Sequence, residues 1–418
     1  MTEFLVTLLG ERLVNSERAE VDVQELGGRL SVLGLFFGCS LSAPCRQFNG
    51  SLRDFYCKFK KASERREELE IVFVSSDQDQ KRWQEFLQEM PWLALHIKDK
   101  HKKMKLWNKY RVTSIPFLVF VDAATGKAVC RNGLLVVQDD PKGLEFPWRP
   151  KPFAEVVAGP LLRKDGHVTD SSSLDGSYVG VYFSAHWCPP CRSLTRALVQ
   201  SYHRLREAGH QLEVVFVSAD RSEDSFMQYL SEMPWVAVPY ADKARRSRLN
   251  RLYGIQGIPT LILLDTDGRV ITRQGRAEVL SDPNCWRFPW HPRPVLDLSE
   301  SNAAQLHEGP CLVLFVDAEE EAELEPAREL LRPIAEKILA NHKAKGEEPP
   351  LLFFVAGEDD MSDSLRDYTN LPEAAPLLTI LDMSARAKFV RDVEEVTAAV
   401  AEQFVSDFLA EKLTPEPI

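Results

Sequence analysis

The chain has 418 residues, of which 44% are apolar and 27% charged, and its formal net charge is −11. This composition is typical of a globular protein, and the length suggests roughly two to four domains. The negative charge argues against nonspecific nucleic-acid binding, and the apolar runs are too short to span a membrane. Eight cysteines are too few for a secreted, disulfide-held scaffold, and the N-terminus lacks the basic region of a signal peptide. We therefore expect a soluble intracellular protein with reduced thiols.

The chain contains an internal repeat in which four short motifs recur 142 to 143 residues later. The matching pairs are residues 71–77 with 214–220, 89–92 with 232–235, 114–116 with 257–259, and 146–148 with 288–290. Recurrence at one nearly constant offset indicates a duplicated structural unit.

The second copy predicts alternating strands and helices that end in a hairpin. The continuous apolar runs Tyr178–Phe183 and Leu212–Ser218 predict strands covered on both faces. Ser222 is a suitable N-cap for a predicted helix that extends to Met233. Thr260–Leu264 is the next predicted strand, and Arg269–Thr272 returns beside it after a turn. This order predicts an α/β unit with a mixed sheet.

The C-terminal part repeats this order of elements a third time. We predict strands at 309–316, 351–356 and 377–381, a helix at Ala327–Ala340, and a polar loop at Asn341–Pro350. Proline-rich segments at 146–152 and 288–294 are typical of stiff domain edges. We therefore expect three domains, at residues 1–152, 153–296 and 297–418.

The second copy carries two cysteines, Cys188 and Cys191, between its first strand and the following helix. A C-x-x-C turn at a helix start is typical of a redox dithiol. The helix dipole favours a thiolate at Cys188, the predicted nucleophile, whereas Cys191 is the predicted resolving thiol, more buried one turn in. Pro189 and Pro190 suit the first helical turn, where a missing N–H does no harm. The alternative, half of a zinc site, needs a second ligand pair, and no other C-x-x-C or C-x-x-H occurs.

The residues around these cysteines carry a family resemblance. Together with residues 184–192, the motifs at 233–235 and 257–260 resemble the thioredoxin superfamily, specifically its tryparedoxin and nucleoredoxin branch. The resemblance covers the whole chain and implies three tandem thioredoxin-like domains, each a central mixed sheet flanked by helices. It implies a protein-disulfide reductase without a bound cofactor, which receives electrons from NADPH through a separate thioredoxin-reductase-like donor.

The resemblance also implies where the protein acts and what it meets. The implied location is cytoplasm and nucleus, and the implied substrates are proteins with disulfides or reactive thiols. A regulatory partner of the Dishevelled type, in Wnt signalling, is implied as well. Neither nucleic acid nor a membrane is an expected partner.

The same resemblance assigns roles to residues near the dithiol. Pro259 is expected to carry a cis peptide bond facing the dithiol, which leaves the Ile258 backbone available to a substrate strand; a plain turn proline is the alternative. Trp187 is expected to shield the nucleophile and contact substrate, with simple packing as the alternative. Thioredoxins have a buried acid six residues before the first cysteine, where this chain has Tyr182. The proton acceptor for Cys191 therefore stays open, with a nearby glutamate or a water as candidates.

The first copy lacks the nucleophile. Aligning Cys45 with Cys191 places Ser42 at the nucleophile's position, and Leu41 stands where the second copy has a tryptophan. Cys39 precedes Cys45 by six residues, and whether these two thiols pair is left open because disulfide geometry is demanding.

Two basic clusters, at 101–105 and 245–248, are expected to be solvated helix faces, with docking of an acidic partner as the alternative. We interpret the whole chain as a protein-disulfide reductase with one active dithiol. A rival hypothesis is a redox-gated scaffold in which the dithiol is a switch, since two of three units lack one. A peroxidase that uses Cys188 directly on peroxide is a third option.

Overall fold

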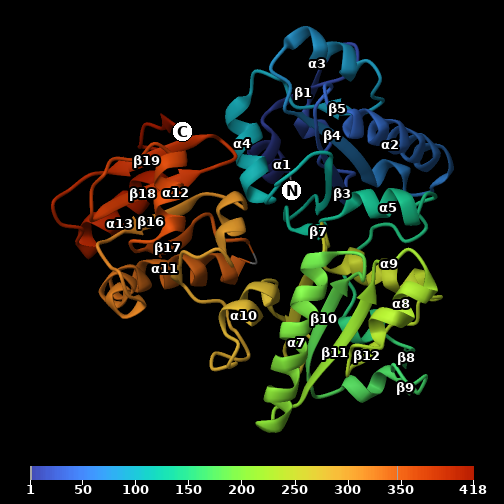
Figure 1. Ribbon diagram of the computed structural model, residues 1–418. Helices are drawn as coiled ribbons and strands as arrows, with labels where there is room; N and C mark the ends of the chain where they lie inside the picture. The colour runs from blue at the N-terminus through green and yellow to red at the C-terminus, as the bar shows by residue number, and fades with distance from the viewer. Residues whose placement is uncertain (1, 346) are drawn as a thin grey trace. The chain divides into compact units, whose positions relative to one another are not determined.

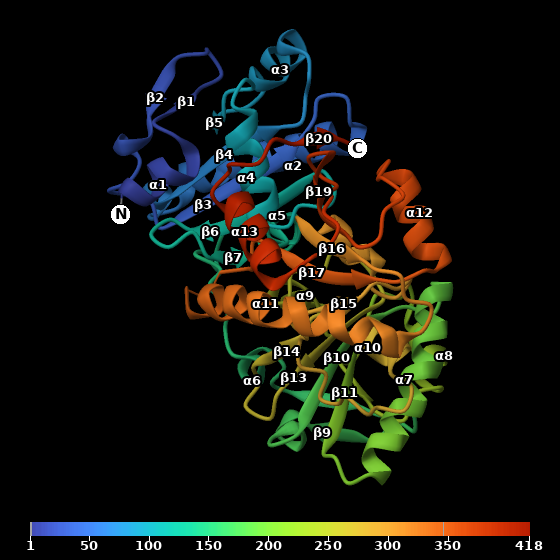
Figure 2. The ribbon, with the colours of Figure 1, turned by 90° about the vertical axis from the view of Figure 1, so that its left-hand side faces the viewer.

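The computed structural model describes residues 2–345 and 347–418. It contains three mixed β-sheets flanked by helices, which confirms the predicted fold class (Figures 1 and 2). The chain divides into two compact units, one built mainly from Val14–Ala94 and Pro116–Pro292, the other mainly from Leu95–Ile115 and Arg293–Ile418. The finer boundaries at 152 and 296 stay a prediction; the first two sheets lie within their predicted ranges, and the third begins at β15 (Leu296–Asp297), which crosses the boundary at 296.

The first sheet has the strand order β2-β1-β5-β4-β3-β6-β7. Its strands are β1 (Arg12–Val14), β2 (Glu20–Asp22), β3 (Val32–Gly38), β4 (Leu69–Ser75), β5 (Leu93–Ala94), β6 (Phe117–Asp122) and β7 (Ala128–Cys130). The helices in this part of the chain are α1 (Thr2–Leu9), α2 (Ala43–Ala62), α3 (Gln80–Leu87), α4 (Lys100–Lys109) and α5 (Gly133–Asp139).

The second sheet has the corresponding order, β14-β13-β10-β11-β12-β8-β9. Its strands are β8 (Pro160–Leu162), β9 (Val168–Asp170), β10 (Tyr178–Ser184), β11 (Leu212–Ser218), β12 (Val236–Ala237), β13 (Thr260–Leu264) and β14 (Val270–Thr272). The helices here are α6 (Phe153–Val156), α7 (Pro189–Glu207), α8 (Glu223–Leu230), α9 (Lys243–Leu252) and α10 (Gly275–Ser281).

The third sheet has the order β15-β17-β16-β18-β19-β20. Its strands are β15 (Leu296–Asp297), β16 (Cys311–Phe315), β17 (Leu352–Ala356), β18 (Leu377–Asp382), β19 (Ala387–Arg391) and β20 (Glu416–Pro417). The helices are α11 (Glu325–Lys345), α12 (Asp360–Tyr368) and α13 (Ala398–Leu409). Helix α11 runs five residues further than the Ala327–Ala340 helix that the sequence predicts, into the predicted loop. Its last turn contains His342, Lys343 and Lys345, which the helix dipole favours there.

An inner strand of the second sheet, β10, positions the dithiol. It pairs in parallel with β11, from Tyr178 opposite Leu212 to Ser184 opposite Ser218. On its other side it pairs antiparallel with β13, where Phe183 lies opposite Thr260. A strand with partners on both sides has a fixed register. The turn that leaves β10 and enters α7 is therefore held in place by the sheet.

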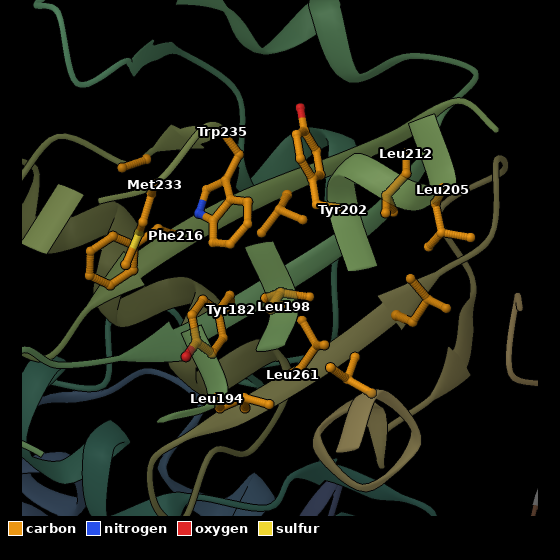
Figure 3. Packing of buried hydrophobic residues seen from close by; sticks show 14 of the residues in the cluster. Tyr182, Leu194, Leu198, Tyr202, Leu205, Leu212, Phe216, Met233, Trp235 and Leu261 are labelled. Carbon is orange, nitrogen blue, oxygen red and sulfur yellow. The ribbon is translucent and has the colours of Figure 1, made fainter. Parts of the chain in front are cut away.

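Helix α7 covers the second sheet through an apolar face that contains Leu194, Leu198 and Leu205 (Figure 3). Trp235 is fully buried beneath it and contacts Tyr182 and Tyr202, with ring centroids 6.3 and 5.5 Å apart. Burying a large aromatic side chain stabilises a domain by about 2 to 3 kcal/mol, more when its neighbours are aromatic. This core fixes the start of α7 relative to β10.

Two arginines of the basic cluster of α9 are held inside, which corrects the expectation of a solvated face for Arg245 and Arg246, whereas Arg248 is exposed as expected. Arg245 is only 4% exposed, and its guanidinium donates to the carbonyls of Val157 (2.9 Å) and Pro160 (2.6 Å). Arg246 donates to the carbonyls of Ser218 and Tyr240. Backbone carbonyls outside the ladder need donors when they are buried, and these arginines supply them.

Each of the two proline-rich segments, 146–152 and 288–294, is held in place by hydrogen bonds to one buried aspartate. Asp282 accepts hydrogen bonds from the backbone N–H groups of Trp286 (3.1 Å) and Arg287 (2.8 Å) and from Nε1 of Trp290 (2.9 Å). In the first copy, Asp140 makes the same three kinds of bond, to residues 144, 145 and 148. Both segments are therefore packed in place, with Trp148 and Trp290 buried, and their role as domain edges stays a prediction.

We expect Asp282→Ala to destabilise the segment that holds Trp290 by about 3 kcal/mol, because the buried indole N–H of Trp290 and two partly buried backbone N–H groups lose their acceptor. Burial acts to raise the pKa of Asp282, but the hydrogen bonds from Arg287, Trp290 and Trp286 outweigh it and hold the pKa below its usual value. A lowered pKa means that the carboxylate's added stability is present above the unfolded-chain pKa and disappears as the pH falls through the folded-state value.

The measurement is hydrogen exchange at residues 282–290, because a chain of several domains does not unfold in one step. Asp282→Asn should retain part of the stability and lose its acid dependence. Asp140→Ala is the matched control, since it should loosen residues 140–148 alone. Unchanged protection around Trp290 in Asp282→Ala would show that this carboxylate does not hold the segment.

Candidate active site

The two cysteines lie where the sequence predicts, at the start of α7. Cys188 is the N-cap residue with extended backbone angles, and Pro189 and Pro190 form the first turn. Cys188 is 6% exposed and Cys191 is fully buried, and both are free thiols. The more accessible sulfur therefore lies at the helix N-terminus, and the less accessible one lies a turn further in.

The surroundings of Cys191 keep it protonated. Burial and, after it, the hydrogen bond with Cys188 raise the pKa of the Cys191 thiol to about 11. The Ser184 hydroxyl and the Ala185 N–H act in the opposite direction. A thiol with this pKa is a poor first nucleophile at neutral pH, which fits the resolving position.

Trp187 lies at the surface beside the dithiol and is 49% exposed. Its Nε1 donates to the carbonyl of Ala219 at 3.3 Å, and the guanidinium of Arg221 lies 4.8 Å from its ring centroid. The indole is thus held in place while one face stays accessible. This arrangement is compatible with the substrate contact that the resemblance implies.

The turn before Trp187 is clamped by Asp220, a residue that the sequence reasoning did not assign to the site. Its carboxylate accepts from the His186 N–H and from the Ser218 hydroxyl, both at 2.8 Å. The first copy has the same interaction, because Asp77 accepts a hydrogen bond from the Ser40 N–H at 3.1 Å. The signal was present in the repeated motifs, since both aspartates end the same matched segment.

The loop that contains Ile258 and Pro259 leads directly into β13, which begins at Thr260. The peptide bond between these residues is cis, as the resemblance implies. Thr260, the next residue, lies opposite Phe183 near the end of β10. The loop therefore lies at the end of the sheet where β10 finishes and the turn with the two cysteines begins.

Tyr182 occupies the place of the expected buried acid and is itself fully buried. Its hydroxyl donates to the carbonyl of Cys191 at 3.1 Å and shares a hydrogen bond with Thr195 at 2.8 Å. In Figure 3 this hydroxyl points away from Trp235, on the side of Leu194. Burial raises the pKa of Tyr182, so the hydroxyl stays neutral.

Three further hydroxyl residues near Cys191 were missed by sequence reasoning. Thr195 Oγ1 lies 2.5 Å from the hydroxyl of Tyr229, which in turn lies 2.8 Å from Oγ of Ser184. These residues come from α7, α8 and β10, and hydroxyl groups have no spacing rule that marks them in a sequence.

The corresponding turn of the first copy has no thiol at the nucleophile's position. Ser42 is the N-cap of α2, and its hydroxyl accepts from the Cys45 N–H at 3.3 Å. Cys39 and Cys45 are both free, and the thiol of Cys39 donates to Asp77 at 3.3 Å. The turn keeps its geometry while lacking the dithiol.

Among the helices of residues 2–345 and 347–418, none combines the length and the apolar character needed to cross a membrane. In the same ranges, no three His, Cys, Asp or Glu side chains are grouped as metal ligands.

The sheet order and the dithiol at a helix N-terminus define a thioredoxin-like thiol oxidoreductase. A family model described as thioredoxin-like matches residues 30–128 and 176–270. Nucleoredoxin of Danio rerio is 79% identical over 418 residues, which is 100% of both chains. Nucleoredoxin of Homo sapiens is 68% identical over 435 aligned residues, again with 100% of both chains covered. The chain belongs to the nucleoredoxin family.

Among solved structures, tryparedoxin I from Crithidia fasciculata is 40% identical, and the match covers 33% of this chain and 97% of that chain with a TM-score of 0.32.

Proposed function

We propose that the chain is a protein-disulfide reductase whose dithiol is Cys188 and Cys191. The observation that carries this proposal is the asymmetry of the two thiols on one helix start. Cys188 is the partly accessible N-cap residue of α7, and Cys191 is fully buried one turn further in and hydrogen-bonded to it. One thiol is thus placed to attack a substrate and the other to complete the reaction.

The reaction has two exchanges. The Cys188 thiolate attacks one sulfur of a substrate disulfide, and the other substrate sulfur leaves and takes up a proton. Cys191 then attacks the Cys188 sulfur of the mixed disulfide, and the second substrate sulfur leaves as a thiol. The substrate gains two electrons and two protons, and the protein is left with a Cys188–Cys191 disulfide.

The disulfide must be reduced again from outside, and we propose NADPH as the electron source through a separate thioredoxin-reductase-like protein. No cofactor bound to this chain is needed, because dithiol exchange passes electrons directly. The loop at Ile258 and Pro259 and the exposed face of Trp187 would contact the polypeptide that carries the disulfide.

The test is reduction of insulin disulfides, followed as NADPH consumption with thioredoxin reductase present. We expect catalytic turnover that depends on this protein, and no turnover with NADPH alone. Absence of insulin reduction, with either thioredoxin reductase or glutathione as the donor, would contradict the proposal. Turnover of hydrogen peroxide in place of insulin would favour a peroxidase.

A second candidate is a redox-gated scaffold, with partners of the Dishevelled type in Wnt signalling, acting in cytoplasm and nucleus. One observation favours it. The first copy has the same sheet order as the second, but the turn before its helix α2 has Ser42 in place of the first cysteine and so holds no dithiol. Partner binding that is equal for oxidised, reduced and Cys188→Ser/Cys191→Ser protein would reject gating and leave a plain scaffold.

A further inference from the structure

Behind the dithiol, four buried hydroxyl groups form a chain that begins and ends at Cys191. The hydroxyl of Ser184 is a hydrogen-bond partner of the Cys191 sulfur. From there the links run to Tyr229 (2.8 Å), Thr195 (2.5 Å) and Tyr182 (2.8 Å). Tyr182 closes the path by donating to the carbonyl of Cys191 at 3.1 Å.

We propose that this chain is the positioning device for the resolving step, and that its donors reverse direction when Cys191 becomes a thiolate. The proposal rests on the proposed disulfide-reductase function and assigns roles to Ser184, Tyr229, Thr195 and Tyr182. Ser184 touches the reacting sulfur, and the other three residues act through it.

The reversal follows from counting protons. Each hydroxyl has one proton to donate and can also accept. With Cys191 as a thiol and the Cys188 sulfur bonded to substrate in the mixed disulfide, the Cys191 S–H donates to Ser184 instead of to Cys188, and every hydroxyl donates onward until Tyr182 donates to the carbonyl. With Cys191 as a thiolate, Ser184 must donate to sulfur, so Tyr229 donates to Ser184, Thr195 to Tyr229, and Tyr182 to Thr195. Either atom can be the donor in all three hydroxyl–hydroxyl links.

Both directions satisfy the buried groups without adding a charge to the chain. In the thiol state all links have a donor. In the thiolate state only the Tyr182 link to the Cys191 carbonyl is given up, and the new charge receives a hydrogen bond, which is stronger than a neutral one. The Ala185 N–H is the other donor to this sulfur, so Ser184 adds a second hydrogen bond to a buried thiolate that would be costly without donors.

The first copy shows that the fold does not need these hydroxyls. At the four corresponding positions it has Phe36, Gly38, Asn49 and Phe86. Phe36 contacts Phe73 and Trp92 as Tyr182 contacts Phe216 and Trp235.

The remaining first-copy positions support the same conclusion. Phe86 lies 5.5 Å from Phe73, matching the 5.3 Å between Tyr229 and Phe216. Asn49 is 1% exposed, and its side-chain oxygen has no hydrogen-bond partner among the described residues. The chain of hydroxyls is therefore absent from the copy that has no nucleophile, and it serves the thiols rather than the core.

During resolution the Cys191 S–H bond breaks, the Cys191 sulfur bonds to the Cys188 sulfur, and the bond from Cys188 to the substrate sulfur breaks. The proton from Cys191 ends on the departing substrate sulfur. The hydroxyls rotate and keep their own protons, so atoms and electrons balance without another reactant.

Ellman's reagent tests the proposal, because each thiol's attack releases one coloured thionitrobenzoate. The first release reports attack by Cys188 and the second reports resolution by Cys191. All proteins should carry Cys39→Ser and Cys57→Ser, since these thiols are at least partly exposed. For Tyr229→Phe we expect a second release about tenfold slower at neutral pH, with its pH profile moved up by about one unit. The first release should stay within about twofold.

The titratable groups that face Cys191 are Cys188 on α7, Tyr229 on α8 and Tyr182 on β10. Neither Tyr229→Phe nor Thr195→Val changes Cys188. Thr195→Ser should have a second release close to that of the unmodified protein, because it keeps the hydroxyl that Thr195→Val lacks. This difference shows that the hydroxyl, and not the packing of the side chain, controls the rate. Tyr202→Phe is the matched control, since Tyr202 lies in the same core outside the chain.

An unchanged second release and pH profile in both Tyr229→Phe and Thr195→Val would overturn the proposal, even if insulin reduction by the unmodified protein is intact. Equal slowing in Tyr202→Phe would also overturn it, because general loosening of the core would then explain the result. Loss of insulin reduction by the unmodified protein would instead reject the proposed function.

Discussion

Replacing Cys188 by serine is expected to reduce disulfide reduction at least about a thousandfold. The thiolate is the nucleophile in this exchange, and a serine hydroxyl remains protonated at every pH that the protein tolerates. Cys191 is not a substitute, because it is fully buried and burial raises its pKa to about 11. The measurement is the initial rate of insulin reduction with NADPH and thioredoxin reductase.

The substitution should leave the fold intact, which makes the result interpretable. Serine is a favourable N-cap residue, and the first copy already has one, Ser42, at the corresponding helix start. Cys57→Ser, which removes an exposed thiol on α2, should retain full activity. Activity of Cys188→Ser within tenfold of the unmodified protein would show that another group attacks the substrate.

Replacing Cys191 by serine is expected to trap the substrate on Cys188. The first exchange does not need Cys191, so the mixed disulfide forms, but its internal attacker is gone. An external thiol at millimolar concentration is a poor replacement for a group already in place, and we expect turnover to fall on the order of a hundredfold. Non-reducing gels with mass spectrometry should show one substrate chain attached to Cys188.

Cys45→Ser is the matched control for the trap. Cys45 occupies the same position at the start of α2 and is also fully buried, but no thiol precedes it at position 42. We expect no adduct and unchanged turnover. Release of product by Cys191→Ser at the normal rate would contradict the assignment of Cys191 as the resolving thiol.

Sequence reasoning located the dithiol and the sheets because both have local signals. The strand at Leu212–Ser218 and the strand at Thr260–Leu264 have the predicted bounds, since uninterrupted apolar runs mark buried strands. The cysteine spacing and the two prolines likewise identify a helix start without any knowledge of the fold.

What the sequence did not predict depends on contacts between distant segments. Arg245 lies in a run of basic residues that favours a solvated face, yet two carbonyls from residues 157 and 160 hold it inside. The hydroxyls of Ser184 and Tyr229 are 45 positions apart and meet only after β10 and α8 have packed. Comparing the two copies position by position would have given one clue, because Phe86 replaces Tyr229.

The neutral character of the hydroxyl chain also affects the oxidised protein. Once Cys188 and Cys191 are joined in a disulfide, neither sulfur can be a thiolate. A buried charged side chain that had assisted the exchange would then remain in the core without a partner. Such a charge costs several kcal/mol unless it is paired. Because burial keeps Tyr182 and Tyr229 protonated, no such charge arises from them. The hydroxyl chain itself therefore stays uncharged in both redox states.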